Sequence, residues 1–213
     1  MIYDIEIAKQ VAKSLLQINA IILQPNNPFK WAAGWNSPIY CDNRKTLSHP
    51  NIRIFIRQGL AAIVKNHYKG ANVIAGVATA GIPHGALVAE ELGLPFIYVR
   101  SKVKKHGKQN QIEGVFKESQ SVVLIEDLIS SGKSSLEAAA TLKNAGMLVK
   151  GMASIFTYGF DAATKNFEKA NCEYISLCDY NTLLPQAIAQ QYIEKKDLSI
   201  LKEWREEPSS WKK

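Results

Sequence analysis

Apolar residues recur along the 213-residue chain with a helical spacing in some segments and in short continuous runs in others. The helical spacing covers roughly 5–23 and then 51–68, and it predicts an amphipathic helix in each segment. Five apolar runs indicate strands: ANVIAGVA, LPFIYVR, SVVLIED, LVKGMASIFTY and CEYISLCDY. Helices are predicted after the first, third and fourth runs, at 82–93, 132–145 and 162–169, and a last helical segment at 183–204.

Strands that alternate with helices are typical of a parallel sheet with right-handed crossovers. We therefore predict an α/β fold with three layers, in which helices cover a Rossmann-like parallel sheet. The length favours one domain. Within it, we expect an N-terminal hood or cap at about 1–48, an α/β core at about 49–180 and a C-terminal helical segment at 181–213.

The composition says more about the cellular compartment of the protein than about its function. The net charge of +7 suits nucleic acid, acidic lipid or small anionic substrates, and it also suits a merely soluble surface. No apolar run approaches the roughly 18 residues of a membrane span, so we expect no membrane partner. The three cysteines are widely spaced and the four histidines are scattered. We therefore expect a reducing cytoplasm, no disulfide framework and no metal ligated by the protein alone.

The most informative stretch is SVVLIEDLISSGKSS, in which Glu126 and Asp127 end an apolar strand. Its Gly-Lys-Ser resembles the end of a P-loop, but that motif needs glycine where Asp127 stands, so a P-loop kinase is disfavoured. Ligands of open α/β sheets bind beyond the carboxyl ends of the strands. The serine hydroxyls and unpaired helix amides at 130–134 form a site for a phosphomonoester. The two carboxylates suit the hydroxyls of a ribose or a hydrated Mg²⁺. The alternative is a helix cap preceded by two solvated carboxylates.

This stretch resembles the phosphoribosyl pyrophosphate (PRPP) motif of the type I phosphoribosyltransferases: four apolar residues, two acids and a short Ser/Gly turn. Three further segments resemble the orotate phosphoribosyltransferase family in the same order: FKWAAGWNSPIYCDNR, GVATAGIPHGALVA and YVRSKVKKHGKQNQIEG. The resemblance covers about 29–160. Its most discriminating pattern is Arg-x-x-x-Lys-x-His-Gly, formed here by Arg100, Lys104, His106 and Gly107.

The resemblance implies the fold of that family and the reaction of orotate with PRPP to give orotidine 5′-monophosphate and pyrophosphate, a step of pyrimidine (UMP) biosynthesis. It implies Mg²⁺ as cofactor, held by PRPP, with Glu126 and Asp127 contributing through water. It also implies a homodimer in which a mobile Lys/His loop reaches the neighbouring subunit's site. The implied PRPP-binding residues are Arg100, Lys104, His106, Glu126, Asp127, Leu128, Ile129, Ser130, Ser131, Gly132, Lys133 and Ser134. Ser130 would also reach orotate.

The residues themselves agree with this chemistry. Displacing pyrophosphate from a ribose needs no protein nucleophile but needs cations at the leaving group, which makes Arg100, Lys104 and His106 catalytic candidates. A solvated charge run is the alternative for this polar segment. The backbone amides of Ala78, Thr79, Ala80 and Gly81 suit pyrophosphate, although a plain strand-to-helix connection would look the same.

Some positions depart from the family pattern. Some orotate enzymes carry lysine at the positions of Ala32, Ala80 and Ser101 and arginine at that of Tyr158. The candidates to replace them are Lys102, Lys105 and Arg44, the last as a weaker orotate ligand. The region of Trp31, Trp35 and Tyr40 is either a hood over the pyrimidine or a packed cap.

Two rival functions share the fold. A purine or xanthine phosphoribosyltransferase generally lacks the Arg/Lys/His pattern. A PRPP-binding transcriptional regulator needs a DNA-reading module, and the 28 residues before Phe29 are too few for a winged helix. We therefore expect no nucleic-acid partner.

Overall fold

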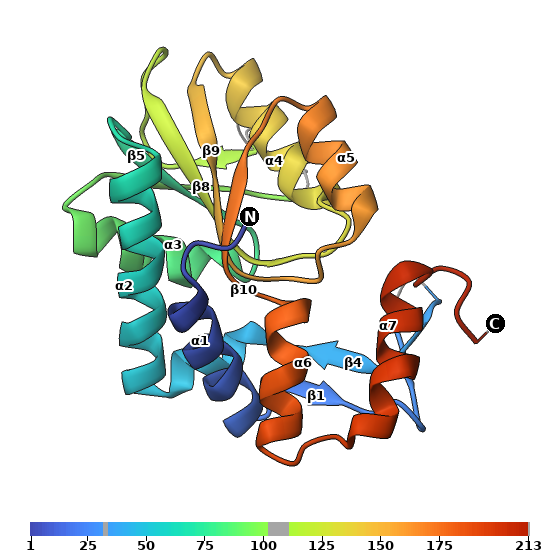
Figure 1. The fold of residues 1–213 in the computed structure, drawn as a ribbon. Coiled ribbons are helices and arrows are strands. Elements are labelled where there is room, and N and C mark those ends of the chain that lie inside the picture. The colour runs from blue at the N-terminus through green and yellow to red at the C-terminus, as the bar shows by residue number, and fades with distance from the viewer. Residues whose placement is uncertain (32–33, 102–110, 213) are drawn as a thin grey trace.

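A six-stranded sheet forms the centre of the computed structural model, which describes residues 1–31, 34–101 and 111–212 (Figure 1). The strand order is β10-β9-β8-β5-β6-β7. The first five of these strands are parallel, and β7 is an antiparallel edge strand. The strands are β5 (Val73–Val77), β6 (Phe96–Val99), β7 (Ile112–Glu113), β8 (Ser121–Ile129), β9 (Leu148–Thr157) and β10 (Tyr174–Asp179). The predicted parallel α/β sheet is confirmed, and β7 is an addition that the sequence did not predict.

Helices cover both faces of the sheet and give the three predicted layers (Figure 1). One face carries α1 (Ile5–Gln17), α2 (Pro50–His67) and α3 (Gly81–Leu92), and the other carries α4 (Lys133–Asn144) and α5 (Asp161–Lys169). Side chains of β8 alternate between the two layers: Val123 and Ile125 join the α1–α3 side, and Val122 and Leu124 join the α4–α5 side. Because both faces are covered, β8 is apolar at successive positions rather than alternating.

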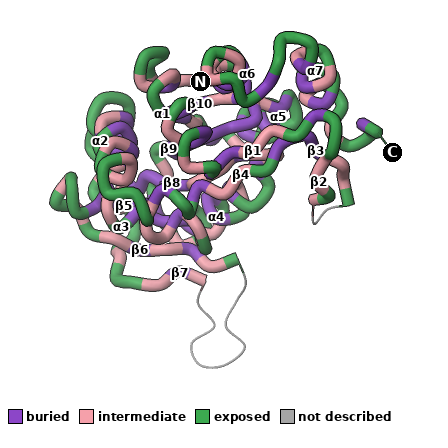
Figure 2. The backbone as a smooth tube through the Cα atoms, turned by 90° about the horizontal axis from the view of Figure 1, so that it is seen from below, coloured by how far each residue is buried: buried purple, intermediate pink, exposed green. Residues whose placement is uncertain are grey.

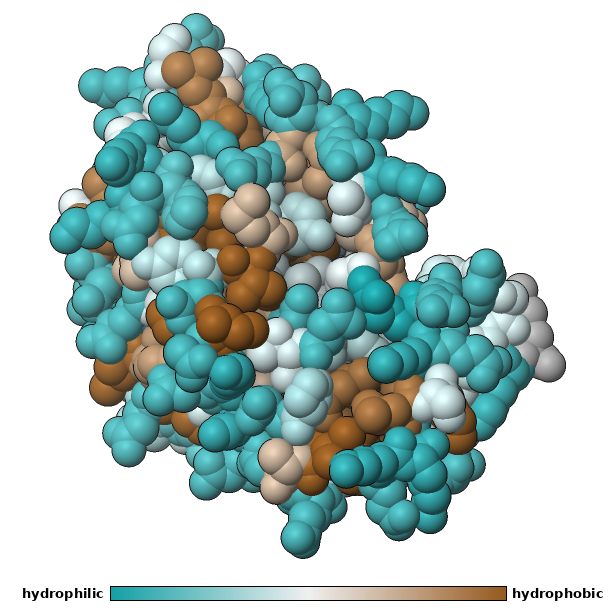
Figure 3. All heavy atoms as spheres, in the orientation of Figure 1, coloured by the Kyte–Doolittle hydropathy of each residue, from teal (hydrophilic) through white to brown (hydrophobic). Residues whose placement is uncertain are grey.

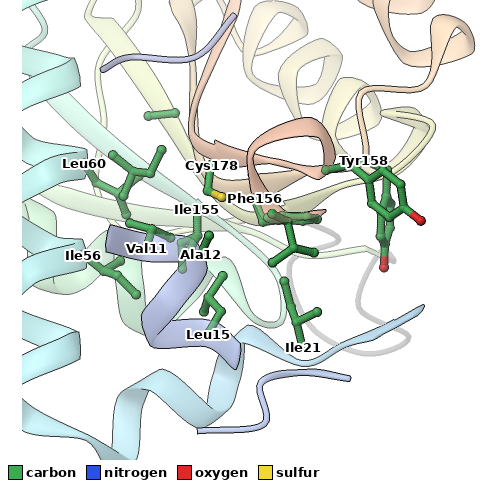
Figure 4. Packing of buried hydrophobic residues seen from close by; sticks show 14 of the residues in the cluster. Val11, Ala12, Leu15, Ile21, Ile56, Leu60, Ile155, Phe156, Tyr158 and Cys178 are labelled. Carbon is green, nitrogen blue, oxygen red and sulfur yellow. The ribbon is translucent and has the colours of Figure 1, made fainter. Parts of the chain in front are cut away.

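Figure 2 shows the buried stretches of β8 and β9 in the middle of the molecule, with exposed residues on the outer helices. The close view in Figure 4 shows how the larger core is filled. Val11 and Leu15 of α1 and Ile56 and Leu60 of α2 point towards Ile155 in that cluster, and all five are almost fully buried.

A smaller unit lies beyond the sheet and is built from two segments of the chain, one before and one after the sheet strands (Figure 1). Its N-terminal part contains β1 (Ile21–Leu23) paired with β4 (Ile39–Cys41), β2 (Phe29–Lys30) paired with β3 (Asn36–Ser37), and a 3-10 helix at Asn43–Ser48. Its C-terminal part contains α6 (Tyr180–Ala189), a 3-10 helix at Lys195–Asp197 and α7 (Leu198–Glu206). The buried indole of Trp204 links the two parts, because it donates to the Asn36 carbonyl at 3.2 Å and packs edge-on against Trp31.

Three sequence predictions about element boundaries were wrong. The first helix ends at Gln17 rather than near residue 23, because Asn19 adopts a left-handed φ of 53° and the chain returns as β1. The predicted helix at 183–204 is two helices, and the turn between them has Gln191 at φ 60°. Strand β8 continues to Ile129, so the acidic pair lies within the strand rather than at its end.

Candidate active site

The acidic pair consists of one buried and one half-buried carboxyl group. Glu126 is only 5% exposed, and both of its carboxylate oxygens are engaged. Oε1 accepts from the Asp127 amide at 3.1 Å, and Oε2 accepts from the Ser135 hydroxyl at 2.9 Å. Since Ser135 belongs to the first turn of α4, Glu126 fastens that helix to β8. Asp127 is half-buried, and the Asn43 side chain donates to its carbonyl at 2.7 Å.

The surroundings of the two carboxyl groups shift their pKa values to different extents. Burial raises the pKa of Glu126 well above its ordinary value, and the neighbouring charge of Asp127 raises it further. Burial also raises the pKa of Asp127, but a hydrogen bond from the Glu126 carboxyl, two backbone amides and the charge of Arg44 oppose that rise. The charged form is therefore disfavoured more strongly for Glu126 than for Asp127. Asp127 is the more exposed of the two carboxyl groups and the one that a ligand can reach.

The turn at 130–134 is held open by its glycine and by one side chain. Gly132 has φ 76°, and a Cβ there would come within 2.5 Å of the Phe167 ring. The Asn166 side chain donates to the Ser131 carbonyl at 3.0 Å and fixes the turn against α5. Within the described residues, the hydroxyls of Ser130, Ser131 and Ser134 have no hydrogen-bond partner. Together with the first amides of α4, they are free donors of the kind that binds phosphate.

The second predicted turn lies against the first. The Ala78–Thr79 peptide bond is cis, and Gly81 then begins α3. A Cβ on Gly81 would overlap the Ile125 carbonyl and lie 3.4 Å from the Glu126 Cα, so the backbone of this turn packs directly on β8 beside the acidic pair. Only glycine permits this approach.

Arg100 meets both turns at one small cavity of about 40 Å³. The lining residues include Ala78 of the turn after β5, Arg100 at the end of β6 and Ser134 at the start of α4. The guanidinium Nη1 of Arg100 lies 3.3 Å from Glu113 Oε1 on β7. The structure therefore brings together three groups that the sequence predicted separately. Lys102, Lys104, Lys105, His106 and Ala32 fall outside the described residues.

On the hood side, Arg44 is an exposed residue that makes a two-pronged ion pair with Asp42, at 2.6 and 3.0 Å. Its charge opposes the rise that burial causes in the pKa of Asp127. Trp31 and Trp35 line a larger cavity of about 460 Å³ together with Ser130 and Ser131. Trp31 also packs on Tyr158, with 5.3 Å between the ring centroids. It therefore contributes both to the lining of the cavity and to the packing of the cap. Tyr40 lies apart from that lining and packs against Phe29.

Sequence reasoning missed several residues of this region. Ser135 and Asn43 position the acidic pair, and both lie within segments that were already singled out, at the first turn of α4 and in the hood motif. Arg205 of α7 lines the larger cavity and gives no sequence signal, because nothing in the local pattern links the C-terminal helix to the turn after β8.

In the described part of the chain, no three or more His, Cys, Asp or Glu side chains are grouped so that they could hold a metal ion. No helix there is both long enough and apolar enough to cross a membrane.

Comparison with known proteins agrees with this geometry. Residues 44–182 match the phosphoribosyl transferase domain. The chain is 52% identical over 205 residues to an orotate phosphoribosyltransferase of Cytophaga hutchinsonii, covering 96% of this chain and 98% of that protein. It also resembles the crystal structure of the Aeropyrum pernix orotate phosphoribosyltransferase, with a TM-score of 0.74 and 25% identity over 83% of this chain and 97% of that one. The Mycobacterium tuberculosis orotate phosphoribosyltransferase in complex with PRPP shares the fold at a TM-score of 0.65, with 20% identity over 83% and 98% of the two chains. With half of its residues identical over almost its full length, the chain belongs to the orotate phosphoribosyltransferase family.

Proposed function

We propose that the protein transfers the 5-phosphoribosyl group of PRPP to orotate, giving orotidine 5′-monophosphate and pyrophosphate for UMP synthesis. The observation that carries the proposal is the convergence of the acidic pair, the Ser/Gly turn and the turn after β5 at one edge of the sheet. The protein of M. tuberculosis with the same fold was solved with PRPP bound.

Each group has a role that follows from its surroundings. The 5-phosphate binds the free hydroxyls and helix amides at 130–134, where the dipole of α4 adds to the attraction. Asp127 accepts hydrogen bonds from the ribose hydroxyls. Glu126 positions Asp127 and α4, because both of its oxygens are already used within the protein. Ser130, which lines both the turn and the larger cavity, is the proposed contact to orotate.

The Ala78 amide is not available, because it donates to the Val99 carbonyl at 2.9 Å, so the prediction that it binds pyrophosphate was wrong. The pyrophosphate lies on the amides of Thr79, Ala80 and Gly81, with Arg100 nearby as a cation. We also assign Lys104 and His106 to this group, on the family pattern alone. Asp127 is the more exposed carboxyl group of the pair and suits a magnesium ion held through water. When bound, Mg²⁺ supplies charge neutralisation on the leaving pyrophosphate. The ribose C1–oxygen bond breaks as the bond to the orotate nitrogen forms, and that nitrogen loses its proton.

The test of the reaction is the PRPP-dependent loss of orotate absorbance, run beside hypoxanthine, xanthine and uracil. Activity on orotate alone is expected, and activity on a purine alone would replace this proposal with a purine phosphoribosyltransferase. Lys104→Ala should lower kcat far more than it raises the KM for orotate, because its charge matters most as pyrophosphate leaves. An effect confined to the KM for orotate would assign Lys104 to the pyrimidine pocket instead.

We further propose a homodimer whose sites are shared between subunits. The support is the family pattern at 100–107, since the corresponding loop reaches the partner's PRPP in the family that the sequence resembles. The test mixes two inactive chains, Lys104→Ala and Asp127→Asn, after dissociation and reassociation. If the loop acts across the interface, a mixed dimer has one intact site, and activity recovers to roughly a quarter of wild type under random pairing. No recovery in a mixture that exchanges subunits would refute shared sites.

We also propose a cytoplasmic location, with Cys41, Cys172 and Cys178 as free thiols. A reducing compartment keeps such cysteines unpaired. Fractionation of the native host, followed by activity measurement in the soluble fraction, tests this proposal.

A further inference from the structure

The cavity of about 460 Å³ opens between the turn after β8 and the C-terminal segment. Figure 3 shows the surface hollowed between the α5 side of the molecule and the α7 side. Ser130 and Ser131 form one wall, Trp31 and Trp35 a second, Phe160 a third, and the chain from Arg205 onwards closes the cavity. A volume of this size suits a small planar ligand next to a bound ribose.

Arg205 is held in this cavity by the main chain rather than by an acidic side chain. Its Nε donates to the Tyr158 carbonyl at 3.2 Å, and its Nη2 donates to the Gly159 carbonyl at 2.7 Å. Gly159 has φ 65°, and a Cβ there would lie 3.3 Å from Nη2, so the guanidinium lies close against the glycine. These two bonds fix the plane of the guanidinium. Its Nη1 has no hydrogen-bond partner among the described residues.

The lining of the cavity matches the chemistry of a pyrimidine carboxylate. Indole and phenyl rings suit the flat faces of the heterocycle, and serine hydroxyls suit its carbonyl groups. Arg205 is the one cation among the residues that line the cavity in the described part of the chain. A guanidinium with a free edge binds a carboxylate with two parallel hydrogen bonds.

A carboxylate bound in this cavity would need Arg205 for two further reasons: the neighbouring Tyr158 is buried, and the other charged residues of the lining are acidic. Tyr158 cannot reach the ligand, because its side chain is 2% exposed and packed among Trp31, Trp204 and Phe160. The rim of the cavity is acidic, since Asp161, Glu206 and Glu207 also line it. These three carboxylates are exposed, so solvent screens them, but they repel an anion that has no direct cationic partner.

We propose that Arg205 is the residue that binds the carboxylate of the pyrimidine and thereby selects orotate over uracil. This inference rests on the proposed function and adds to it the residue that sets base specificity. Arg44 is the rival position on the hood side, but an ion pair with Asp42 already balances its charge, whereas Arg205 donates only to neutral carbonyl groups.

The test compares inhibition by orotidine 5′-monophosphate with inhibition by UMP, two nucleotides that differ only in the carboxylate. In Arg205→Gln, the inhibition constant of orotidine 5′-monophosphate should rise about 10- to 150-fold, the range for loss of a charged hydrogen bond, while that of UMP stays within about twofold. Arg205→Lys should fall between the variant and wild type. Lys202→Gln removes an exposed charge from the same helix and should behave like wild type.

Inhibition constants do not depend on the fraction of folded enzyme, so a loss of stability in Arg205→Gln leaves the comparison valid. An equal rise for both nucleotides, or no rise, would overturn the role of Arg205. A selective rise in Arg44→Gln instead would move the carboxylate to the hood side. Wild-type enzyme that uses PRPP but shows no preference for orotate would refute the proposed function itself.

Discussion

Gly76→Ala tests whether the turn at Ala78–Gly81 is locked to the sheet. Gly76 lies on β5, two residues before the turn. A Cβ at this position would lie 2.8 Å from the Ile82 Cα and 2.9 Å from the Gly81 carbonyl oxygen, both of which are backbone atoms of the first turn of α3. Ordinary contact begins near 3.5 Å, so α3 must move by about 0.7 Å. Overpacking of this kind costs about 1–3 kcal/mol.

Two measurements follow from that displacement. In a domain of this size, each kcal/mol lowers the Tm by about 2–4 °C, so thermal unfolding should shift down by roughly 2–12 °C. The proposed pyrophosphate amides move with α3, so kcat/KM for PRPP should fall by about 10- to 100-fold in the enzyme that remains folded. Circular dichroism and initial-rate kinetics report the two effects separately.

Gly59→Ala is the matched control. Its Cβ would meet Leu177 Cδ2 at 2.9 Å, which is almost the same distance, but this atom is the end of a flexible side chain. Alanine is also favoured over glycine within α2 by about 1 kcal/mol. Gly59→Ala should therefore lose little stability and no PRPP affinity. Equal losses in the two variants, or unchanged PRPP kinetics in Gly76→Ala, would refute the proposed close packing of turn and sheet.

Three further predictions concern ionisable groups and their partners. Burial lowers the pKa of His84 to about 4 from 6.5, so the unfolded chain takes up the proton first as pH falls, and stability is lost between these values. Between pH 7 and pH 5, the unfolding free energy of wild type should fall by about 2 kcal/mol more than that of His84→Gln in urea titrations. The same pH dependence in both proteins would contradict a buried neutral histidine. Asp127→Asn should weaken PRPP binding by about 1.5–3 kcal/mol in calorimetry, and unchanged affinity would exclude its role at the ribose. Ser135→Ala leaves a buried oxygen of Glu126 without its donor and should cost about 1–3 kcal/mol of stability, whereas a neutral effect would mean that water takes the place of the hydroxyl.

The parts of the fold that could be predicted from sequence are those fixed by neighbouring residues. The apolar runs of β5, β8 and β9 are buried on both faces, so their composition alone identifies them as strands of a covered parallel sheet. The boundaries that were wrong depend on distant partners. Residues 21–23 continue an apolar pattern, but they form β1 because β4 lies alongside them, and β4 comes sixteen or more residues later in the chain.

The candidate site likewise has some features that neighbouring residues determine and others that depend on distant residues. Glu126 and Asp127 were found as a pair, but the sequence could not show that they differ. Their difference comes from Ser135, from burial and from Arg44, which lies in the hood. Equal roles at the ribose were therefore the natural expectation, and the structure instead engages both Glu126 oxygens within the protein.

Recognition of the phosphate and recognition of the base differ in how they are built, and this difference explains why only one of them was visible in the sequence. A phosphate is bound by consecutive amides and hydroxyls, so one strand, one turn and one helix start contain almost the whole site. A pyrimidine with a carboxylate needs an aromatic face and a cation that approach from other directions. Here these come from Trp31 near the N-terminus and from Arg205 near the C-terminus, and they meet only because Trp204 packs α7 onto the hood. Base specificity in this protein should therefore be more sensitive to changes in the packing of α7 than PRPP binding is.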